Sequence, residues 1–360
     1  MAPPRPRSRP TTRAMRARAA ASSDRIPPDV LFDVLLRLPA RDLCRLRAVS
    51  RSWRALASDP LFVAAHAARH GGPLFLAKFR DDKTSVYAVD LSGDVVKRVA
   101  AGAGGGPYHR LLCTRLDLGC LATDWNRVAA TGEHKVLRMF NRLGFHNGGQ
   151  QIFEVFTING GTDHARWRGR QGPGLFIDEC SGVVVDGVVY FLTSRVYEGA
   201  HCGIRPDYIV SFDLGREEWM RDLRGPISSN AGYAKVSLYT RRQLALAELK
   251  GSLVLADHYH QPFTMDLWFL SDFRSGLWVK QYHIRIESLN LRSADEYHEY
   301  HLKPLLVLDD GRLVLYLAPT GRLFICDPGT SIFIQLDMRR LDSVGVYTGN
   351  LLNSEEGERV

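Results

Sequence analysis

The feature that most constrains the fold is a short pattern that occurs three times in the second half of the chain. Each copy has an apolar strand, a tight turn with glycine, and a second apolar strand, as in "CSGVVVDGVVYFL", "LALAELKGSLVLADHY" and "KPLLVLDDGRLVLYL". The pairs Asp186–Gly187, Lys250–Gly251 and Asp310–Gly311 are residue types that tight β-hairpin turns favour. Repetition of this unit predicts an all-β repeat architecture.

The spacing of these hairpins predicts a kelch-like β-propeller. The turn glycines recur at intervals of roughly 60 residues, longer than the ~50 residues of a kelch repeat, and loop insertions account for the difference. Weaker copies such as "SVYAVDLSGDVVKRV" precede them. At about 47 residues per blade, residues 71–353 would hold about six blades. An incomplete or irregular propeller is the alternative, because most copies lack the kelch Gly-Gly doublet.

Residues 24–70 follow a different pattern, which predicts three or four short helices. Residues 22–24 can cap a first helix, and Pro39 ends it. The apolar residues of this helix recur at helical spacing: Val30, Leu31, Val34, Leu35 and Leu38. The last helix begins after Asp59 and ends before Gly71. So wide an apolar stripe on so small a unit is expected to dock on a partner protein.

The segment "IPPDVLFDVLLRLPARDLCRLRAVSRSWRALASDPLF" resembles the F-box along its whole length. The positions that match the family pattern are Ile26, Pro27, Asp29, Val34, Leu35, Leu38, Pro39, Leu43, Arg45, Val49, Trp53, Pro60 and Phe62. An F-box is a three-helix element that docks on a SKP-type adaptor, and the adaptor links it to a cullin–RING scaffold that transfers ubiquitin. The resemblance implies an adaptor-binding set of Ile26, Pro27, Leu31, Val34, Leu35, Leu38, Pro39, Leu43, Val49 and Trp53. A helical cap that packs only on the chain's own large domain is the alternative.

The second part of the chain is similar to the F-box-associated, kelch-like region of plant F-box proteins, in "DGVVYFL", "YIVSFDLGREEW" and "VAATGE". The last phrase lacks the Asn-Pro that is common in that region. We therefore predict an α+β multidomain chain with a basic arm (1–23), an F-box (24–70), a mainly-β propeller-like domain (71–353) and a tail (354–360). The resemblance implies a substrate-recruiting subunit of a SKP–cullin–F-box ubiquitin ligase. A non-ligase scaffold and a propeller enzyme are the alternatives.

The positive charge of the chain is concentrated in its arm. The formal net charge is +8, and residues 1–23 contain six arginines and no acidic residue. The rest of the chain is therefore close to neutral and offers no basic face for nucleic acid. The arm is expected to be a disordered, solvated tail. A nuclear-import signal, a nucleic-acid patch and an organellar transit peptide are the alternatives.

The six cysteines include no CxxC pair, and we find no secretory segment and no apolar run long enough for a membrane span. This combination favours a reducing compartment, the cytoplasm or the nucleus, with an organellar destination of the arm as the alternative.

Motifs of catalysis and cofactor binding are missing from the sequence. There is no P-loop, no G-x-S-x-G and no H-E-x-x-H. The run "AGAGGGP" is not followed by a helical pattern and is interpreted as a blade insertion. "DHYH" (257–260) and "HEYH" (298–301) contain metal-binding residue types, but no third and fourth ligands lie near them in the sequence. We therefore expect neither a catalytic site, nor a metal, nor a cofactor.

Three polar connections with aromatic residues are candidate target-binding loops: residues 193–208, 257–265 and 291–303. Connecting loops of a propeller vary freely in length and chemistry, and aromatic residues and arginine are enriched in interface hot spots. The candidate residues are Tyr197, Arg205, Tyr208, Tyr259, Phe263, Tyr297 and Tyr300. At least two of the three loops are expected to converge on one rim. Ordinary surface loops are the alternative.

Overall fold

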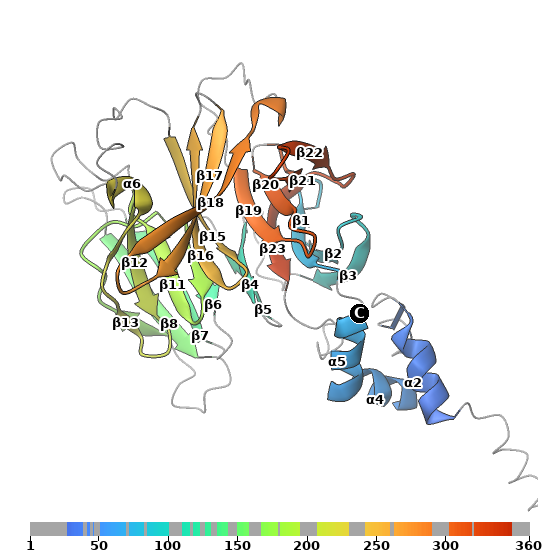
Figure 1. Ribbon diagram of the computed structural model, residues 1–360. Helices are drawn as coiled ribbons and strands as arrows, with labels where there is room; N and C mark the ends of the chain where they lie inside the picture. Colours follow the sequence, from blue (N-terminus) through green and yellow to red (C-terminus); the bar gives the residue numbers. More distant parts are fainter. Residues whose placement is uncertain are drawn as a thin grey trace, which may run out of the picture. The chain divides into compact units, whose positions relative to one another are not determined.

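In the computed structural model, the chain divides into two compact units, residues 1–71 and residues 72–360. The described residues are 27–38, 42–43, 46, 51–69, 72–82, 85–100, 110–115, 118–122, 127–130, 135–142, 150–157, 167–178, 181–194, 207–229, 242–259, 263–289, 302–318 and 320–347. Helices make up the first unit, and strands dominate the second (Figure 1).

The first unit, here called the helical unit, contains α2 (Pro28–Leu36), α4 (Arg51–Ala57) and α5 (Pro60–Arg69). Both α2 and α5 begin at a proline, which the first turn of a helix tolerates because its N–H groups have no partner within the helix. Asp59 caps α5, since its Oδ1 accepts a hydrogen bond from the Leu61 N–H at 2.8 Å. The start of this helix was therefore predicted correctly.

The core of the helical unit is small and centres on Phe62, which is completely buried. The rings of Phe32 and Phe62 meet edge to face with centroids 5.1 Å apart, so α2 packs on α5. His66 stacks on Phe62 and places its Nε2 2.9 Å from the Leu38 carbonyl oxygen. Leu35 of α2 is also buried, at 1% exposure. Each large side chain buried in this way contributes about 1.5–3 kcal/mol.

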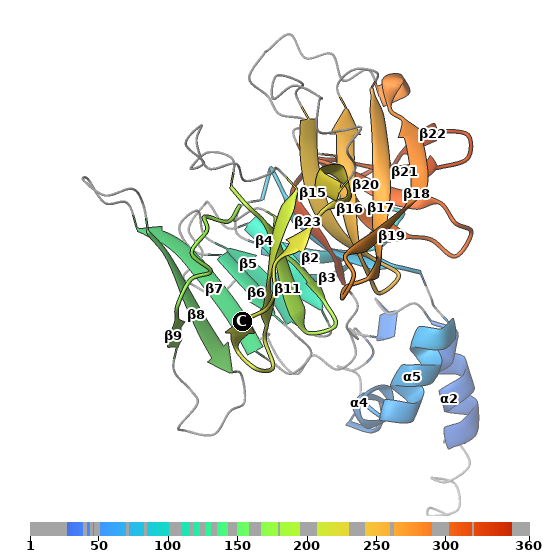
Figure 2. The same cartoon turned by 60° about the vertical axis from the view of Figure 1, so that its left-hand side comes forward.

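The second unit, the β domain, consists of antiparallel sheets that are neighbours in chain order (Figure 2). The first blade has the strand order β23 (Leu341–Tyr347), β1 (Leu74–Phe79), β2 (Ser85–Val89) and β3 (Val95–Ala100), and β4 (Arg110–Arg115) pairs with β5 (Leu118–Ala122). The next blade contains β6 (Arg127–Ala130), β7 (Lys135–Arg142), β8 (Gln150–Thr157) and β9 (Arg168–Arg170). The blade after it contains β10 (Val183–Val185), β11 (Val188–Leu192), β12 (Tyr208–Asp213) and β13 (Glu218–Trp219), and β14 (Leu223–Arg224) also pairs with β12. The last two blades have four strands each. One contains β15 (Arg242–Leu249), β16 (Ser252–Tyr259), β17 (Thr264–Asp272) and β18 (Leu277–Arg285). The other contains β19 (Leu302–Val307), β20 (Leu313–Leu317), β21 (Arg322–Asp327) and β22 (Ile332–Gln335). Two short helices, α6 (Pro226–Ser229) and η1 (Glu287–Leu289), lie in the connections between blades.

These sheets form a closed propeller, because the first strand of each sheet lies beside the first strand of the next. The contacts run from β23 to β4, β6, β10, β15 and β19, and β19 returns to β23. Within the described residues, five sheets have four or more strands, and the two-stranded sheet β4–β5 lies between the first blade and β6. The predicted mainly-β propeller of about six blades is therefore confirmed, with one reduced sheet.

The hydrophobic core of the β domain lies between neighbouring blades. One cluster joins the β6–β9 blade to the β10–β14 sheet, the next joins that sheet to β15–β18, and a third joins β15–β18 to β19–β22. A fourth cluster joins β19–β22 to the first blade around Phe75, Phe79 and Leu341. Because every cluster needs two blades, the blades cannot be stable separately.

Two of the three predicted hairpin turns have two residues, and the third is longer. Asp186–Gly187 and Lys250–Gly251 have positive φ at both positions, which is the primed turn that suits a twisted hairpin. In the third, the Leu308 N–H donates to the Arg312 carbonyl at 2.7 Å, which leaves three residues in the loop. Gly311 alone has positive φ there, the arrangement of a type I turn followed by a bulge.

Candidate functional site

The predicted adaptor-binding residues divide into core and surface. Leu35 and Leu43 are buried at 1% exposure and hold the helical unit together, whereas Val34 is 50% exposed. Leu31, Leu38 and Trp53 are partly buried, and Pro27 is exposed. Ile26, Pro39 and Val49 lie outside the described residues. Only part of the predicted set can therefore present apolar surface directly to a partner.

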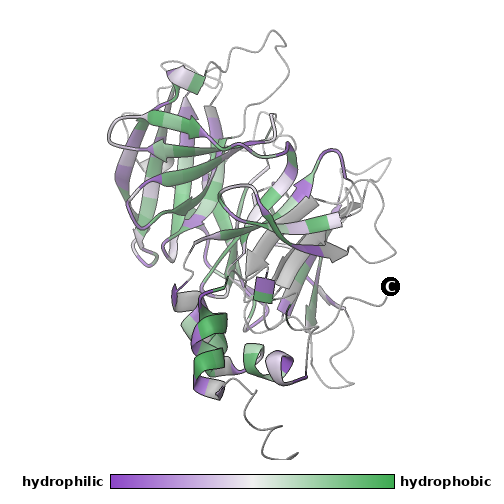
Figure 3. Ribbon diagram, turned by 90° about the vertical axis from the view of Figure 1, so that its right-hand side faces the viewer, coloured by the Kyte–Doolittle hydropathy of each residue, from purple (hydrophilic) through white to green (hydrophobic). Residues whose placement is uncertain are grey.

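Two further exposed apolar side chains were not in the predicted set. Val30 is 49% exposed, and Leu61 is 77% exposed beside the buried Phe62. Val30 and Val34 are four residues apart on α2 and so share one helix face. The helices of this unit are coloured largely as hydrophobic in Figure 3. The apolar stripe could have indicated Val30, but which of two adjacent apolar residues of α5 faces outward depends on packing.

The β domain has a second candidate surface at one end of its blades, which we call the loop end. In a blade of four antiparallel strands, two connections lie at the same end. One joins the second strand to the third, and the other leads to the next blade. In the β15–β18 blade, the cross-strand row of Tyr259, Thr264 and Arg285 marks this end. Tyr259 and Phe263 of the predicted loop 257–265 lie at this end, whereas residues 291–301 of the predicted loop 291–303 lie outside the described residues.

Three of the seven predicted target-binding residues lie among the described residues, and all three are at the loop end of their own blade. Tyr208 begins β12, and its hydroxyl donates to Asp222 Oδ2 at 2.9 Å. Partial burial, together with this carboxylate, raises the pKa of Tyr208. Tyr259 ends β16, and Phe263 precedes β17 in the left-handed region at φ 57°. Tyr197, Arg205, Tyr297 and Tyr300 lie outside the described residues.

A buried polar group lies just below the loop end of the β15–β18 blade. The Asp266 side chain is 5% exposed, and its Oδ1 is 2.5 Å from His283 Nδ1. Lys280 Nζ lies 3.3 Å from the other oxygen of Asp266. His258 Nε2 lies 3.0 Å from the Leu302 carbonyl oxygen. The Asp266 contacts join β17 to β18, and the His258 contact joins β16 to β19. Within the described residues no group of three or more His, Cys, Asp or Glu is placed to hold a metal ion.

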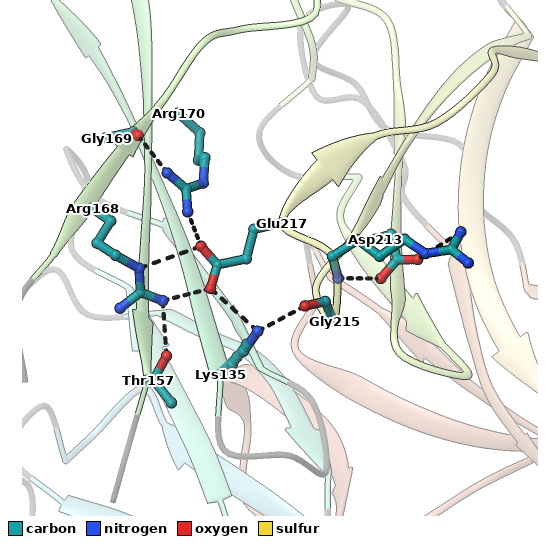
Figure 4. A network of polar contacts seen from close by, with 9 residues as sticks. Lys135, Thr157, Arg168, Gly169, Arg170, Asp213, Gly215 and Glu217 are labelled. Atoms are coloured by element: carbon teal, nitrogen blue, oxygen red, sulfur yellow. Dashed lines mark hydrogen bonds and ion pairs between the residues drawn. The ribbon is translucent and has the colours of Figure 1, made fainter. Parts of the chain in front are cut away.

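A third cluster of charged residues joins two blades, and we call it the charged seam (Figure 4). Glu217 lies in the turn between β12 and β13. It forms ion pairs with Lys135, Arg168 and Arg170 of the preceding blade. Arg168 Nη2 lies 2.5 Å and Lys135 Nζ 3.2 Å from Glu217 Oε1. These residues are far apart in sequence, so no local motif could have predicted the cluster.

The sequence comparisons agree with both units. The F-box-like family matches residues 23–65, which include all of α2 and α4. The family of the F-box associated beta propeller domain matches residues 129–344, more than half of the chain. The chain belongs to the F-box-associated β-propeller family. The resemblance to plant F-box proteins that we inferred from the sequence is thereby confirmed.

Several proteins of Arabidopsis thaliana are similar to this chain, two of them over more than two thirds of its length. An F-box protein is 24% identical over 322 residues, 75% of this chain and 74% of the relative. An F-box/LRR-repeat protein is 22% identical over 307 residues, 73% of this chain and 68% of the relative. Another F-box protein matches locally, with 33% identity over 79 residues, 22% of this chain and 21% of the relative. None of the described helices is long and apolar enough to cross a membrane.

Proposed function

We propose that this chain is the substrate-recruiting subunit of a SKP–cullin–F-box ubiquitin ligase. The observation that carries the proposal is the joining of an F-box-like segment to an F-box-associated propeller in one chain. The helical unit would bind a SKP-type adaptor, which connects to a cullin–RING scaffold. The β domain would bind the target protein. The compartment that fits this role is the cytoplasm or the nucleus.

The adaptor would bind through exposed apolar side chains of the helical unit. Val30, Val34 and Leu61 are the large apolar side chains that the described part of this unit exposes most. Apolar surface of this kind drives association when a partner removes it from water. Leu35 and Phe62 would act indirectly, because their packing holds α2 against α5.

The target would bind at the loop end of the β domain, where Tyr208, Tyr259 and Phe263 lie at strand ends. Loops on a rigid scaffold carry the variable chemistry of recognition. The chain would then contribute proximity, because a bound target is held at a high effective concentration near the ubiquitin-transferring subunits. No bond would be made or broken by the chain itself.

The proposal is tested first by adaptor capture with the full chain. The change Val34→Asp together with Leu61→Asp should weaken capture at least tenfold, because burial of one large apolar side chain is worth roughly 1.5–3 kcal/mol. Asp33→Asn, at an exposed position next to Val34, is the matched control and should bind like the wild type. Equal capture by the double variant and the wild type would contradict the adaptor role.

Co-purification then separates a ligase subunit from a scaffold. A ligase subunit should bring down a cullin together with a protein that accumulates when the proteasome is blocked. Adaptor without cullin would indicate a non-ligase scaffold. Discovery of the mature chain inside an organelle, with residues 1–23 removed, would contradict the proposed compartment.

A further inference from the structure

Two cysteines lie opposite one another in the two-stranded sheet of the β domain. β4 and β5 pair antiparallel, and their register places Cys113 directly opposite Cys120. A register shift lies between Leu111 and Cys113, and from Cys113 to Arg115 the pairing is regular. The hairpin therefore brings together, as one cross-strand pair, two cysteines that are seven positions apart in the sequence.

The spacing of opposed residues in an antiparallel pair is compatible with a disulfide bond. Directly opposite Cα atoms are about 4.5 Å apart at non-hydrogen-bonded positions and about 5.5 Å apart at hydrogen-bonded positions. Disulfide-bonded cysteines have Cα atoms about 4.4–6.8 Å apart. Both kinds of position lie within this range, so the register of Cys113 and Cys120 allows a bond without a change in strand pairing.

The same register would make the bond easy to reduce. Opposed Cβ atoms in an antiparallel pair are usually about 4.5–5.5 Å apart, whereas a disulfide requires about 3.5–4.5 Å. A bond between the two strands must therefore draw them closer, and the resulting strain makes the bond more reducible. Strained disulfides are of the labile, regulatory kind rather than the permanent kind. In a reducing compartment the two thiols would be the resting state, and the disulfide would be transient.

The place of the hairpin in the ring gives such a bond a structural consequence. β4 contacts both β23 and β6, and β5 contacts β6, so the hairpin lies between the first blade and the β6–β9 blade. Within the described residues it has two strands, whereas the sheets on both sides have four. A covalent bond between β4 and β5 would therefore reinforce the part of the ring that has the fewest paired strands.

We propose that Cys113 and Cys120 are a redox modification site, at which a peroxide forms a reversible cross-strand disulfide. The thiolate of one cysteine attacks an oxygen of hydrogen peroxide and becomes a sulfenic acid, with release of one water molecule. The thiol of the other cysteine then attacks the sulfenic sulfur, forms the S–S bond and releases a second water molecule. Two thiols and one peroxide thus give one disulfide and two waters, and two electrons pass from sulfur to the peroxide. A small thiol such as glutathione restores both cysteines by exchange. The site does not depend on the proposed ligase function.

Hydrogen peroxide treatment of the full chain, followed by alkylation of free thiols and digestion with trypsin, tests the site directly. Trypsin cleaves after arginine, so Cys113 and Cys120 fall on two different peptides, residues 111–115 and 116–127. We expect mass spectrometry to find these two peptides joined after peroxide treatment and separate again after dithiothreitol. Cys113→Ser should abolish the joined peptides.

Cys326→Ser is the matched control for this experiment. Cys326 is completely buried, and burial together with the neighbouring Asp327 raises the pKa of its thiol to about 12. Almost no thiolate is then available to react with peroxide at neutral pH. The Cys326→Ser variant should therefore form the joined peptides to the same extent as the wild type.

A comparison with the urea-unfolded chain separates the effect of the fold from nearness in the sequence. In the same glutathione buffer, the folded chain should hold the disulfide to a several-fold greater extent than the unfolded chain. By linkage, oxidation should then raise the unfolding temperature, but only by a few degrees because the loop that the bond closes is short. The proposal would be overturned by joined peptides that are absent from the wild type or equally abundant in the unfolded chain. A lower unfolding temperature after oxidation would overturn it as well.

Discussion

Glu217 shows how a single residue is held in an unfavourable backbone conformation by its partners. Its φ is 59°, a region that costs energy for a side chain with a Cβ. Gly276, Ser331 and Gly93 also have positive φ, and they lie in the turns between the last two strands of other blades. Glycine or serine is therefore sufficient for the turn, and glutamate at this place is explained by its contacts with Lys135, Arg168 and Arg170.

The same residue gives a prediction about pH. Partial burial alone would raise the pKa of Glu217, but hydrogen bonds from Arg168, Arg170 and Lys135 outweigh it and lower the pKa from 4.5 to about 2. A carboxyl group whose pKa is lowered on folding stabilises the folded state at any pH above its unfolded pKa. This contribution is lost as the pH falls through the folded pKa. In phosphate-free buffer at pH 6, Glu217→Gln should therefore lower the free energy of unfolding by about 2 kcal/mol.

Urea unfolding of wild type and Glu217→Gln at pH 6, 4 and 3 would measure this contribution. The difference between the two proteins should be largest at pH 6 and should shrink between about pH 4.5 and pH 2. Arg216→Gln, which is 80% exposed in the same turn, serves as the control and should change stability little. A difference that stays constant over this range would show that the carboxylate charge is not responsible.

At the scale of elements, hairpins and helices were predictable where local chemistry fixes them. Asp186–Gly187 and Lys250–Gly251 adopt the primed turns that their residue types favour, and Asp59 caps α5. The loop at Asp310–Gly311 is a residue longer than the sequence pattern indicates, because Leu308 and Arg312 pair outside it. The apolar stripe alone does not predict which apolar residues of the helices remain exposed. Leu61 is an example, because its exposure depends on tertiary packing.

The turn between β15 and β16 gives a matched pair of stability predictions. Lys250 and Gly251 have φ of 51° and 76°, and glycine and asparagine tolerate this region better than other residues. Lys250→Asn should raise the free energy of unfolding by roughly 0.5 kcal/mol, and Gly251→Ala should lower it by about 1 kcal/mol or more. Thermal unfolding of both variants beside the wild type is the measurement. Effects of the same sign would contradict the assigned turn.

At the scale of the whole molecule, the propeller was predictable from repeated hairpins, but its closure was not. Blades are local in sequence, so spacing alone indicates their approximate number. The pairing of β23 with β1 joins residues from the two ends of the β domain, and no local pattern specifies such a long-range contact. The charged seam was missed for a related reason, since its residues lie far apart along the chain and come together only in the fold.

This closure leads to the last prediction. β23 pairs with β1 from Leu74 opposite Tyr347 to Phe79 opposite Leu341. Leu341 and Val344 are buried at 0% and 7% exposure in the cluster that joins the first and last blades, and Tyr347 is buried at 8% exposure. Their burial is worth roughly 1.5–3 kcal/mol each, comparable in sum to the 5–15 kcal/mol that keeps a typical domain folded. A chain that ends at residue 340 should therefore lose its cooperative thermal transition or become insoluble. A chain that ends at Tyr347 keeps β23 and should melt within a few degrees of the wild type. A cooperative transition in the shorter chain would show that the propeller does not need β23 to close.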